Sequence, residues 1–329
     1  MSDFVVIQTE ELEPAPASWL AERCDLIVCP HDDPRLAELL PRADGMIVRT
    51  YTRVDEGLLS HALRLRVVGR AGVALENFDL AACRRRGVRV VHTPGANTRA
   101  VVELVTALML DILRPRVSMT QAVPPPQWHA LRRDYTATKQ LSDLTLGVWG
   151  FGRIGSSMAR VAAALDMRCI YHDVLDIPEP RRHGARPVDV DALLRESDIL
   201  SVHVDFRPGN HHLVNREAFA RMKRDVVIIN TSRGFVLDPI AAAEFLRANP
   251  DARGAFDVHD PTEPIPADYP LLGLPNAIIT PHLASGTVTA KTNMSWVVRD
   301  VWRVLSGEEP EFEAVYPIIA NPIGGRTPT

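Results

Sequence analysis

The sequence predicts an α/β fold made of two doubly wound parallel sheets. Two series of short apolar segments, one within the first 95 residues and one after residue 144, alternate with segments of helical composition. Such alternation is typical of strand–helix–strand units in which neighbouring strands run parallel. The length of 329 residues is too great for one ordinary domain and suits two. We therefore expect each series to form its own sheet.

The first series is expected to form five strands. Its apolar runs are short, and the stretches at 36–40 and 80–86 between them have the composition of helices. The expected strands read FVVIQ, DLIVC, GMIVR, LRVVGR and VRVVH.

A long helix and a connector are expected between the two series. Apolar residues recur at intervals of three and four over 98–113, which predicts an amphipathic helix. Pro115 follows and ends this helix. Residues 123–143 are polar and contain several prolines, so we expect a loop-rich connector that carries Trp128.

The second series is expected to form six strands, followed by one last helix. Six parallel strands are the usual size of a dinucleotide-binding domain. The last amphipathic helix is expected at about 288–305, before Gly307. The expected strands read LGVWG, RCIYHD, DILSVHV, VVIIN, GAFDV and AIIT.

The composition excludes several classes of function. Apolar residues make up 46% of the chain and charged residues 24%, as in a folded globular protein. The formal net charge of −4 provides no positive field for nucleic acid or an anionic membrane. The chain has no run of roughly 18 apolar residues, and its first residues lack the pattern of a secretory signal. We expect a cytoplasmic protein without nucleic-acid or membrane partners.

No metal site is expected either. The four cysteines are too few and too irregularly spaced for a disulfide framework or a structural zinc site. His211 and His212 form a bare pair with no third ligand at helical spacing.

A glycine motif at the start of the second series predicts a dinucleotide site. An apolar strand runs into Gly150-x-Gly152-x-x-Gly155 and then into a helix, as in Rossmann-like domains. The glycines permit a tight turn, close approach of a pyrophosphate and close packing of helix on strand. Asp173 lies 18 residues beyond Gly155, at the end of the next strand, where a carboxylate can bind the ribose hydroxyls. The cofactor is therefore expected to be NAD.

The same region leaves one alternative for the cofactor. Arg181 and Arg182 follow in the next loop, and their guanidinium groups could reach a 2′-phosphate. NADP therefore stays open, although Asp173 would repel that phosphate.

Later strands end in residues suited to hydride-transfer chemistry. Arg233, Asp257, Glu263 and His282 follow three successive strands, and ligands of open α/β sheets bind at such carboxyl ends. Reduction of a 2-oxo acid needs a cation for the carboxylate and a proton donor for the developing alkoxide. Arg233 suits the first task through its forked donors. His282 suits the second, and Glu263 would favour its charged form.

These motifs resemble those of the D-isomer-specific 2-hydroxy-acid dehydrogenases. The resemblance covers roughly residues 44–307, and the motifs occur in the family's order. They are IVRTYTRV, VVGRAGVALENFD, VHTPGANTRAVVELV, LGVWGFGRIG, INTSRG and TPHLAS.

The resemblance implies a discontinuous architecture. A flavodoxin-like substrate-binding domain would comprise residues 1–97 and 287–329, and an NAD-binding Rossmann domain of residues 98–286 would be inserted into it. It also implies a homodimer, built through the long helix and the connector around Trp128.

The resemblance assigns roles to single residues. Arg233, Glu263 and His282 would form the catalytic triad, and Val73 and Ala74, together with Arg233, would bind the substrate carboxylate. Asp257 would meet the nicotinamide carboxamide. The implied cofactor-binding residues are Gly150, Gly152, Arg153, Ile154, Gly155, Asp173, His203, Thr231 and Asp257.

Several residues depart from the family's pattern. Ala74 replaces a glycine of the substrate loop, which matters if that position needs a positive φ. Asp205 stands where a proline usually contacts the cofactor. The segment DVHDPTEP is one residue longer than usual, so Asp260 could pair with His282 in place of Glu263.

Within the family, the early motifs are most similar to 3-phosphoglycerate dehydrogenases in a short form without a regulatory domain. Arg49 would then bind the substrate phosphate, unless it merely pairs with a neighbouring acid. A glyoxylate or hydroxypyruvate reductase is the alternative within the same chemistry. An alternative of another class is an NAD(H)-sensing interaction protein similar to corepressors of this fold.

Overall fold

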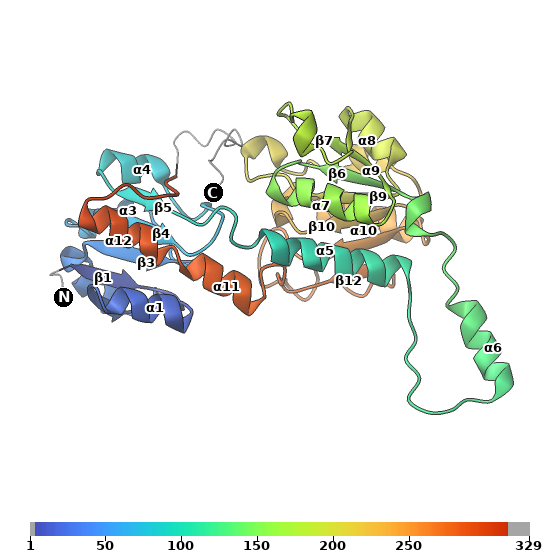
Figure 1. Ribbon diagram of the computed structural model, residues 1–329, viewed down its shortest axis with the longest axis horizontal. Coiled ribbons are helices and arrows are strands. Elements are labelled where there is room, and N and C mark those ends of the chain that lie inside the picture. The colour runs from blue at the N-terminus through green and yellow to red at the C-terminus, as the bar shows by residue number, and fades with distance from the viewer. Residues whose placement is uncertain (1–3, 315–329) are drawn as a thin grey trace. The chain divides into compact units, whose positions relative to one another are not determined.

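The computed structural model describes residues 4–314. The chain divides into two compact units, which are Met1–Ala100 with Ser285–Thr329 (unit 1) and Val101–Ala284 (unit 2). Each unit holds one parallel sheet with helices on both faces (Figure 1), so the predicted doubly wound α/β fold with a discontinuous first part is confirmed. The predicted domain boundaries were 97/98 and 286/287.

Unit 1 contains a five-stranded parallel sheet in the order β2-β1-β3-β4-β5. This is the flavodoxin-like order. The five predicted strands are found as β1 (Val5–Gln8), β2 (Asp25–Val28), β3 (Gly45–Val48), β4 (Val67–Arg70) and β5 (Arg89–Val91). The helices are α1 (Pro14–Ala21), α2 (Leu36–Leu39), α3 (Glu56–His61), α4 (Leu80–Arg85), α11 (Val288–Ser295) and α12 (Val298–Ser306).

Alternation along the strands of unit 1 builds a core on each face of the sheet. Ile7 and Met46 pack with residues of α3 and α4 on one face, whereas Val6 and Ile47 pack with residues of α1 and α12 on the other. Successive side chains of a strand point to opposite faces, so a strand buried on both faces reads as a continuous apolar run. This explains why the sequence shows these strands so clearly.

The end of the described chain returns to this sheet. Asp300 of α12 is buried and accepts hydrogen bonds from the backbone N–H groups of Glu311 and Phe312. The segment then forms an antiparallel bridge between Glu313 and Val91, at the edge strand β5.

The predicted single helix at 288–305 is wrong in part, because the chain forms α11 and α12 with a break at Trp296–Val297.

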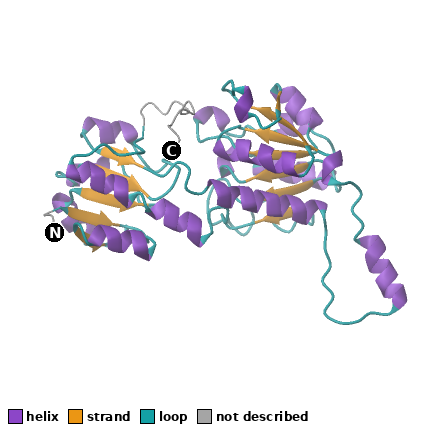
Figure 2. Cartoon of the chain, in the orientation of Figure 1, coloured by secondary structure: helices purple, strands orange, loops and turns teal. Residues whose placement is uncertain are grey.

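Unit 2 contains a seven-stranded parallel sheet in the order β12-β11-β10-β9-β6-β7-β8, shown as arrows in Figure 2. Numbered within the unit and read from β8, this order begins 3-2-1-4-5-6, as in dinucleotide-binding domains. The strands are β6 (Thr145–Trp149), β7 (Arg168–His172), β8 (Arg186–Pro187), β9 (Ile199–Val202), β10 (Val227–Asn230), β11 (Arg253–Phe256) and β12 (Ala277–Ile279). The six predicted strands are present, and the short polar strand β8 is additional.

Helices cover both faces of this sheet. The helices α5 and α7 share one apolar cluster with Leu146, Val148 and Ile229, and the helices α8 to α10 share the other with Leu200 and Ile228. The bounds are α5 (Thr98–Leu113), α7 (Arg153–Ala164), α8 (Val190–Glu196), α9 (Arg216–Arg221) and α10 (Pro239–Ala248).

The connector after α5 contains a helix that the sequence did not predict. The helix α6 (Pro125–Asp134) begins with prolines in its first turn, where the missing N–H costs nothing, and it ends with Arg132 and Arg133. None of its residues is buried, and it extends away from the rest of unit 2 in Figure 1. Trp128 is 47% exposed. The connector is thus a projecting arm.

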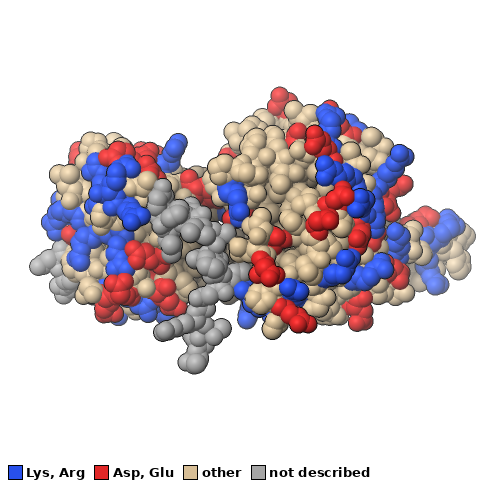
Figure 3. Space-filling model, turned by 90° about the horizontal axis from the view of Figure 1, so that it is seen from above, with Lys and Arg blue, Asp and Glu red and all other residues tan. Residues whose placement is uncertain are grey.

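The surface carries charged side chains of both signs (Figure 3). On the face shown in Figure 3, basic and acidic side chains are interspersed. Within residues 4–314, no helix is both long and apolar enough to cross a membrane.

Gly69 is a position where the packing of unit 1 can be tested. A Cβ atom at this position of β4 would lie 2.4 Å from a methyl group of Val301 in α12. Because a valine side chain cannot rotate away freely, Gly69→Ala is expected to lower the free energy of unfolding of unit 1 by about 1–3 kcal/mol. Urea denaturation measures this loss.

The control is the double variant Gly69→Ala/Val301→Ala. It is expected to lose less stability than the two single variants added together, because the second change removes the clash. Full stability of the single Gly69→Ala variant would show that α12 does not pack against β4 as described.

Candidate active site

The predicted site residues of unit 2 lie in loops that follow the carboxyl ends of parallel strands. These loops follow β6, β7, β9, β10, β11 and β12, and every strand pair of the sheet is parallel. The structure therefore brings the loops to one edge of the sheet. In chain order, these loops and the first turn of α7 carry Gly150, Gly152, Arg153, Ile154, Gly155, Asp173, His203, Thr231, Arg233, Asp257, Glu263 and His282.

Glu263 and His282 form a hydrogen-bonded pair. Glu263 Oε2 lies 2.6 Å from His282 Nδ1, and Glu263 Oε1 accepts a hydrogen bond of 2.9 Å from the backbone N–H of His259. The bond to Glu263 raises the pKa of His282 above its usual value, although burial opposes this shift. Burial likewise opposes ionisation of Glu263, but the bonds from His282 and His259 leave its pKa lowered. The pair therefore favours a protonated imidazole beside a charged carboxylate.

Asp260, the alternative partner of His282, faces another histidine. Its Oδ2 atom lies 3.3 Å from Nε2 of His212. The loop at 259–264 thus accommodates its additional residue while Glu263 still reaches His282. The geometry favours Glu263 over Asp260.

Asp257 holds the turn that carries His282. Its carboxylate is fully buried and accepts hydrogen bonds from Thr280 Oγ1 at 2.5 Å, from the Leu283 N–H at 2.7 Å and from the Ala284 N–H at 2.8 Å. His282 adopts a positive φ of 54° within this turn. A non-glycine residue in this region needs support from its surroundings. In this structure Asp257 provides that support.

Arg233 lies in a loop packed closely against the loop after β11. A Cβ atom at the neighbouring Gly234 would lie 1.9 Å from the carbonyl oxygen of His259, so only glycine fits there. The half-buried guanidinium of Arg233 donates to the carbonyl of Ser232 at 2.6 Å. It is also close enough to His282 to act against the rise of that residue's pKa. The positive charge of Arg233 therefore acts on His282.

The glycine loop has the shape that a pyrophosphate needs. Gly150 has a φ of 92°, and a Cβ atom there would lie 2.6 Å from the His203 carbonyl oxygen. A Cβ atom at Gly152 would meet nothing within 4 Å, so the backbone is open to a ligand. Gly152 also begins α7 without a side-chain cap, which leaves the first N–H groups of the helix for an anion.

Two buried polar atoms at this edge also fit a bound dinucleotide. Nδ1 of His203 and Oγ1 of Thr231 are buried and have no hydrogen-bond partner among the described residues. Burial lowers the pKa of His203 to about 3, so the ring is neutral. Unsatisfied buried polar atoms are costly, and a ligand that bonds to them removes this cost.

Asp173 lies beside the glycine loop, as the motif predicted. Its two carboxylate oxygens accept hydrogen bonds from the N–H groups of Phe151, at 2.6 Å, and Leu175, at 2.8 Å. Arg182 is directed to the carbonyl of Ile177 at 2.6 Å and to Asp176. The carboxylate of Asp173 is therefore fixed at the end of β7, beside the glycine loop.

Sequence reasoning missed several contacts that shape these loops. His259 provides the amide that orients Glu263, and Asp205 binds Arg207 through two hydrogen bonds of 2.7 and 2.8 Å. Asp205 replaces the expected proline, and its ion pair with Arg207 now orders the loop after β9. No local pattern in the sequence indicates these contacts.

The predicted substrate-binding residues of unit 1 follow β3 and β4. The Arg49 guanidinium donates to the carbonyl of Glu11 at 3.2 Å, and Nδ1 of His92 lies 2.9 Å from the carbonyl oxygen of Val73. Some described residues that are not glycine have a positive φ, but Ala74 is not one of them. The alanine is therefore compatible with this loop.

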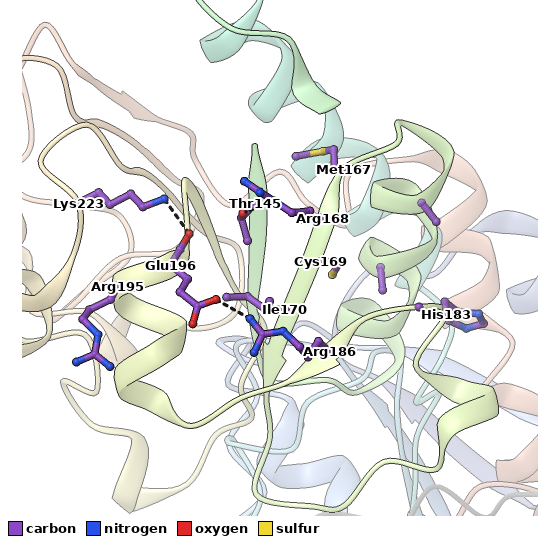
Figure 4. A pocket seen from close by; sticks show the side chains of 13 residues that line it. Thr145, Met167, Arg168, Cys169, Ile170, His183, Arg186, Arg195, Glu196 and Lys223 are labelled. Atoms are coloured by element: carbon purple, nitrogen blue, oxygen red, sulfur yellow. Dashed lines mark hydrogen bonds and ion pairs between the residues drawn. The ribbon is translucent and has the colours of Figure 1, made fainter. Parts of the chain in front are cut away.

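A cavity of about 800 Å³ lies at the opposite edge of the unit 2 sheet, near the amino ends of β6 and β7 (Figure 4). None of the predicted site residues lines it. Its basic side chains include Arg186, which pairs with Glu196 at 2.5 Å, and Lys223, which pairs with Asp198 at 2.7 Å. Basic residues are common at this edge because helix C-termini carry partial negative charge. This cavity is not the candidate active site.

The chain matches a known family and known relatives. Residues 106–284 match the family model described as "D-isomer specific 2-hydroxyacid dehydrogenase, NAD binding domain". The chain is 33% identical over 307 residues to a glyoxylate reductase of Thermofilum pendens, covering 89% of each protein. It is 34% identical over 262 residues to a D-3-phosphoglycerate dehydrogenase of Archaeoglobus fulgidus, covering 79% of this chain and 49% of that protein.

A solved structure has the same fold at similar identity. The TT0316 protein from Thermus thermophilus superposes with a TM-score of 0.81 at 34% sequence identity, covering 95% of this chain and 100% of that one. Together with the glycine loop and the pair of Glu263 and His282, these matches establish the family resemblance of the sequence. The chain belongs to the D-isomer-specific 2-hydroxyacid dehydrogenase family and is an NAD-dependent oxidoreductase.

Proposed function

We propose that the protein interconverts a D-2-hydroxy acid and the corresponding 2-oxo acid, with His282 as the acid–base residue. The observation that carries this proposal is the 2.6 Å contact between Glu263 and His282, at the same sheet edge as the glycine loop. A histidine held by a carboxylate at one nitrogen is suited to transfer a proton at the other. Arg233, close to His282, binds the substrate carboxylate.

The proposed mechanism assigns one task to each of these residues. In the reductive direction, bound NADH supplies the hydride. Arg233 holds the 2-oxo acid through its forked donors and orients the carbonyl group. His282 donates the Nε2 proton to the developing alkoxide, and Glu263 at Nδ1 stabilises the imidazolium before the transfer. In the oxidative direction, neutral His282 accepts the hydroxyl proton at Nε2.

The role of His282 can be tested by substitution. His282→Ala removes the proton donor and is expected to lower kcat by about 10²- to 10⁴-fold. The dissociation constant of NADH, measured by fluorescence, should stay the same, because His282 does not belong to the glycine loop. His61→Ala, at an exposed histidine of α3, is the control and should keep its turnover. Wild-type turnover of His282→Ala would exclude His282 from the mechanism.

Another prediction concerns pH. Because Glu263 raises the pKa of His282, the protonated form needed for reduction persists to higher pH and is lost as pH rises through the raised pKa. Glu263→Gln removes the cause, so the alkaline limb of kcat/KM for reduction should move to lower pH. Stopped-flow measurement of NADH oxidation across pH checks this shift.

The matched control for pH is Asp268→Asn, which removes one exposed acid from the same loop region. Its profile should overlay that of the wild type. If the profile of Glu263→Gln also overlays the wild type, Glu263 does not set the protonation of His282.

As substrate pair we propose 3-phosphoglycerate and its 2-oxo form, with Arg49 binding the phosphate. In support, no described carboxylate forms an ion pair with the Arg49 guanidinium, which leaves its charge available for an anion. A glyoxylate or hydroxypyruvate reductase is the second candidate. It is supported by the glyoxylate reductase match, which covers 89% of both proteins, whereas the phosphoglycerate dehydrogenase is covered to 49%.

A panel of substrates separates the two candidates. NADH oxidation is measured with 3-phosphohydroxypyruvate, hydroxypyruvate, glyoxylate and pyruvate, for the wild type and for Arg49→Ala. Preference for the phosphorylated acid, lost by at least about tenfold in Arg49→Ala, supports the first candidate. Preference for another acid, unaffected by Arg49→Ala, supports the second. Silence on all four acids would favour an NAD(H)-sensing interaction protein.

We also propose that the protein is a homodimer formed through the arm that carries α6. The arm exposes Met119, Trp128 and Tyr135, and large exposed apolar side chains on one segment are typical of interaction surfaces.

A further inference from the structure

In unit 1, the side-chain carboxylate of Glu10 binds the backbone of the loop at 49–52. Glu10 follows β1, and the loop at 49–52 follows the neighbouring strand β3. Because β1 and β3 are parallel, both ends lie at the carboxyl edge of the sheet, where open α/β sheets bind ligands. Glu10 therefore lies beside the loop that carries Arg49.

Four consecutive backbone N–H groups donate to this carboxylate. Oε1 accepts from Arg49 at 2.9 Å and from Thr52 at 3.1 Å, and Oε2 accepts from Thr50 at 2.7 Å. The N–H of Tyr51 lies 3.2 and 3.1 Å from the two oxygens. The Thr52 hydroxyl adds a fifth bond at 3.0 Å.

Successive amides that converge in this way form a concave site for an anion. Hydrogen bonds to a charged acceptor are roughly twice as strong as neutral ones. Burial opposes ionisation of Glu10, yet the four amides hold its pKa below the usual value, so the anion persists at neutral pH. The chain thus fills its own anion site with Glu10.

Further contacts make the loop rigid. The hydroxyl groups of Thr9 and Thr52 lie 2.6 Å apart, and the Asn77 side-chain amide donates to the carbonyls of Thr52 at 2.7 Å and Arg49 at 3.3 Å. Both the N–H and the C=O of Arg49 are therefore held by other residues. Asn77 also ties the loop to the segment after β4, which contains Val73 and Ala74.

We propose that Glu10 is the positioning residue of the substrate loop, because its carboxylate fixes residues 49–52 and thereby the Arg49 side chain that meets the acid substrate. This inference rests on the proposed function of Arg49. Since Glu10 occupies the backbone amides, the distal group of the substrate is recognised by the Arg49 side chain and not by the backbone of the loop.

The test compares Glu10→Gln with Glu11→Gln, which removes the same charge from the exposed neighbouring side chain. Hydrogen exchange of the amides at 49–52 is measured first, because it does not depend on activity. Next, kcat and KM are measured with the acid that the wild type reduces best, together with the dissociation constant of NADH. Glu10→Asp, which keeps the charge but shortens the side chain, is measured in the same way in case Glu10→Gln does not fold.

The expected result distinguishes an effect on the loop from an effect on the chemical step. In Glu10→Gln, exchange at 49–52 and KM for the acid should each rise by at least about tenfold, because charge-assisted bonds are lost. The kcat value and the NADH dissociation constant should stay within about twofold, and Glu11→Gln should match the wild type. In Glu10→Asp, exchange at 49–52 and KM for the acid should also rise, but by less than in Glu10→Gln. If Glu10→Gln does not fold, these two values of Glu10→Asp serve as the test.

Three outcomes would overturn the proposal. Unchanged exchange at 49–52 would show that Glu10 does not fix the loop. Faster exchange with an unchanged KM would show that the fixed loop does not serve the substrate, while the proposed reaction stands. Absence of turnover in the wild type on every acid would remove the proposed function and, with it, the substrate role of Glu10.

Discussion

Backbone N–H groups in the loops at the ends of parallel strands must find acceptors, and in this protein side-chain carboxylates provide them. Buried amides without partners are costly, and a loop that leaves a sheet has lost the ladder that would satisfy them. Asp257 accepts two amides of the turn around His282, Asp173 accepts an amide of the glycine loop, and Glu10 accepts four amides of the Arg49 loop. The candidate functional loops are thus ordered by hydrogen bonds to side-chain carboxylates.

Carboxylates also set the electrostatics around His282. Glu263 accepts a hydrogen bond from the His259 amide and also faces His282. One side chain therefore both positions the proposed proton donor and favours its protonated form. Asp257 lies close by and also favours the protonated form of His282, whereas Arg233 opposes it. Structural support and acid–base tuning therefore come from the same few residues, and a change at Asp257 or Glu263 affects both.

The strands were predictable because parallel sheets buried on both faces leave continuous apolar runs. The short strand β8 escaped prediction because Arg186 and Pro187 are not apolar, and α6 escaped because none of its residues is buried. The strand-end residues were predictable from chemistry and from the family resemblance. The amide contacts of Glu10 were not, because they join residues 39 to 42 positions apart and depend on which strands are neighbours.

The discontinuity of unit 1 also has a consequence for synthesis of the chain. One face of its sheet, with Val6, Ile47 and Val67, is covered by α12, yet β4 ends at Arg70 and α12 begins at Val298. A growing chain therefore has α1 but not α12 to cover this apolar face while all of unit 2 is made. Because domains fold as units during translation, unit 2 can reach its native state first. Unit 1 can therefore complete its core only after α12 has been made.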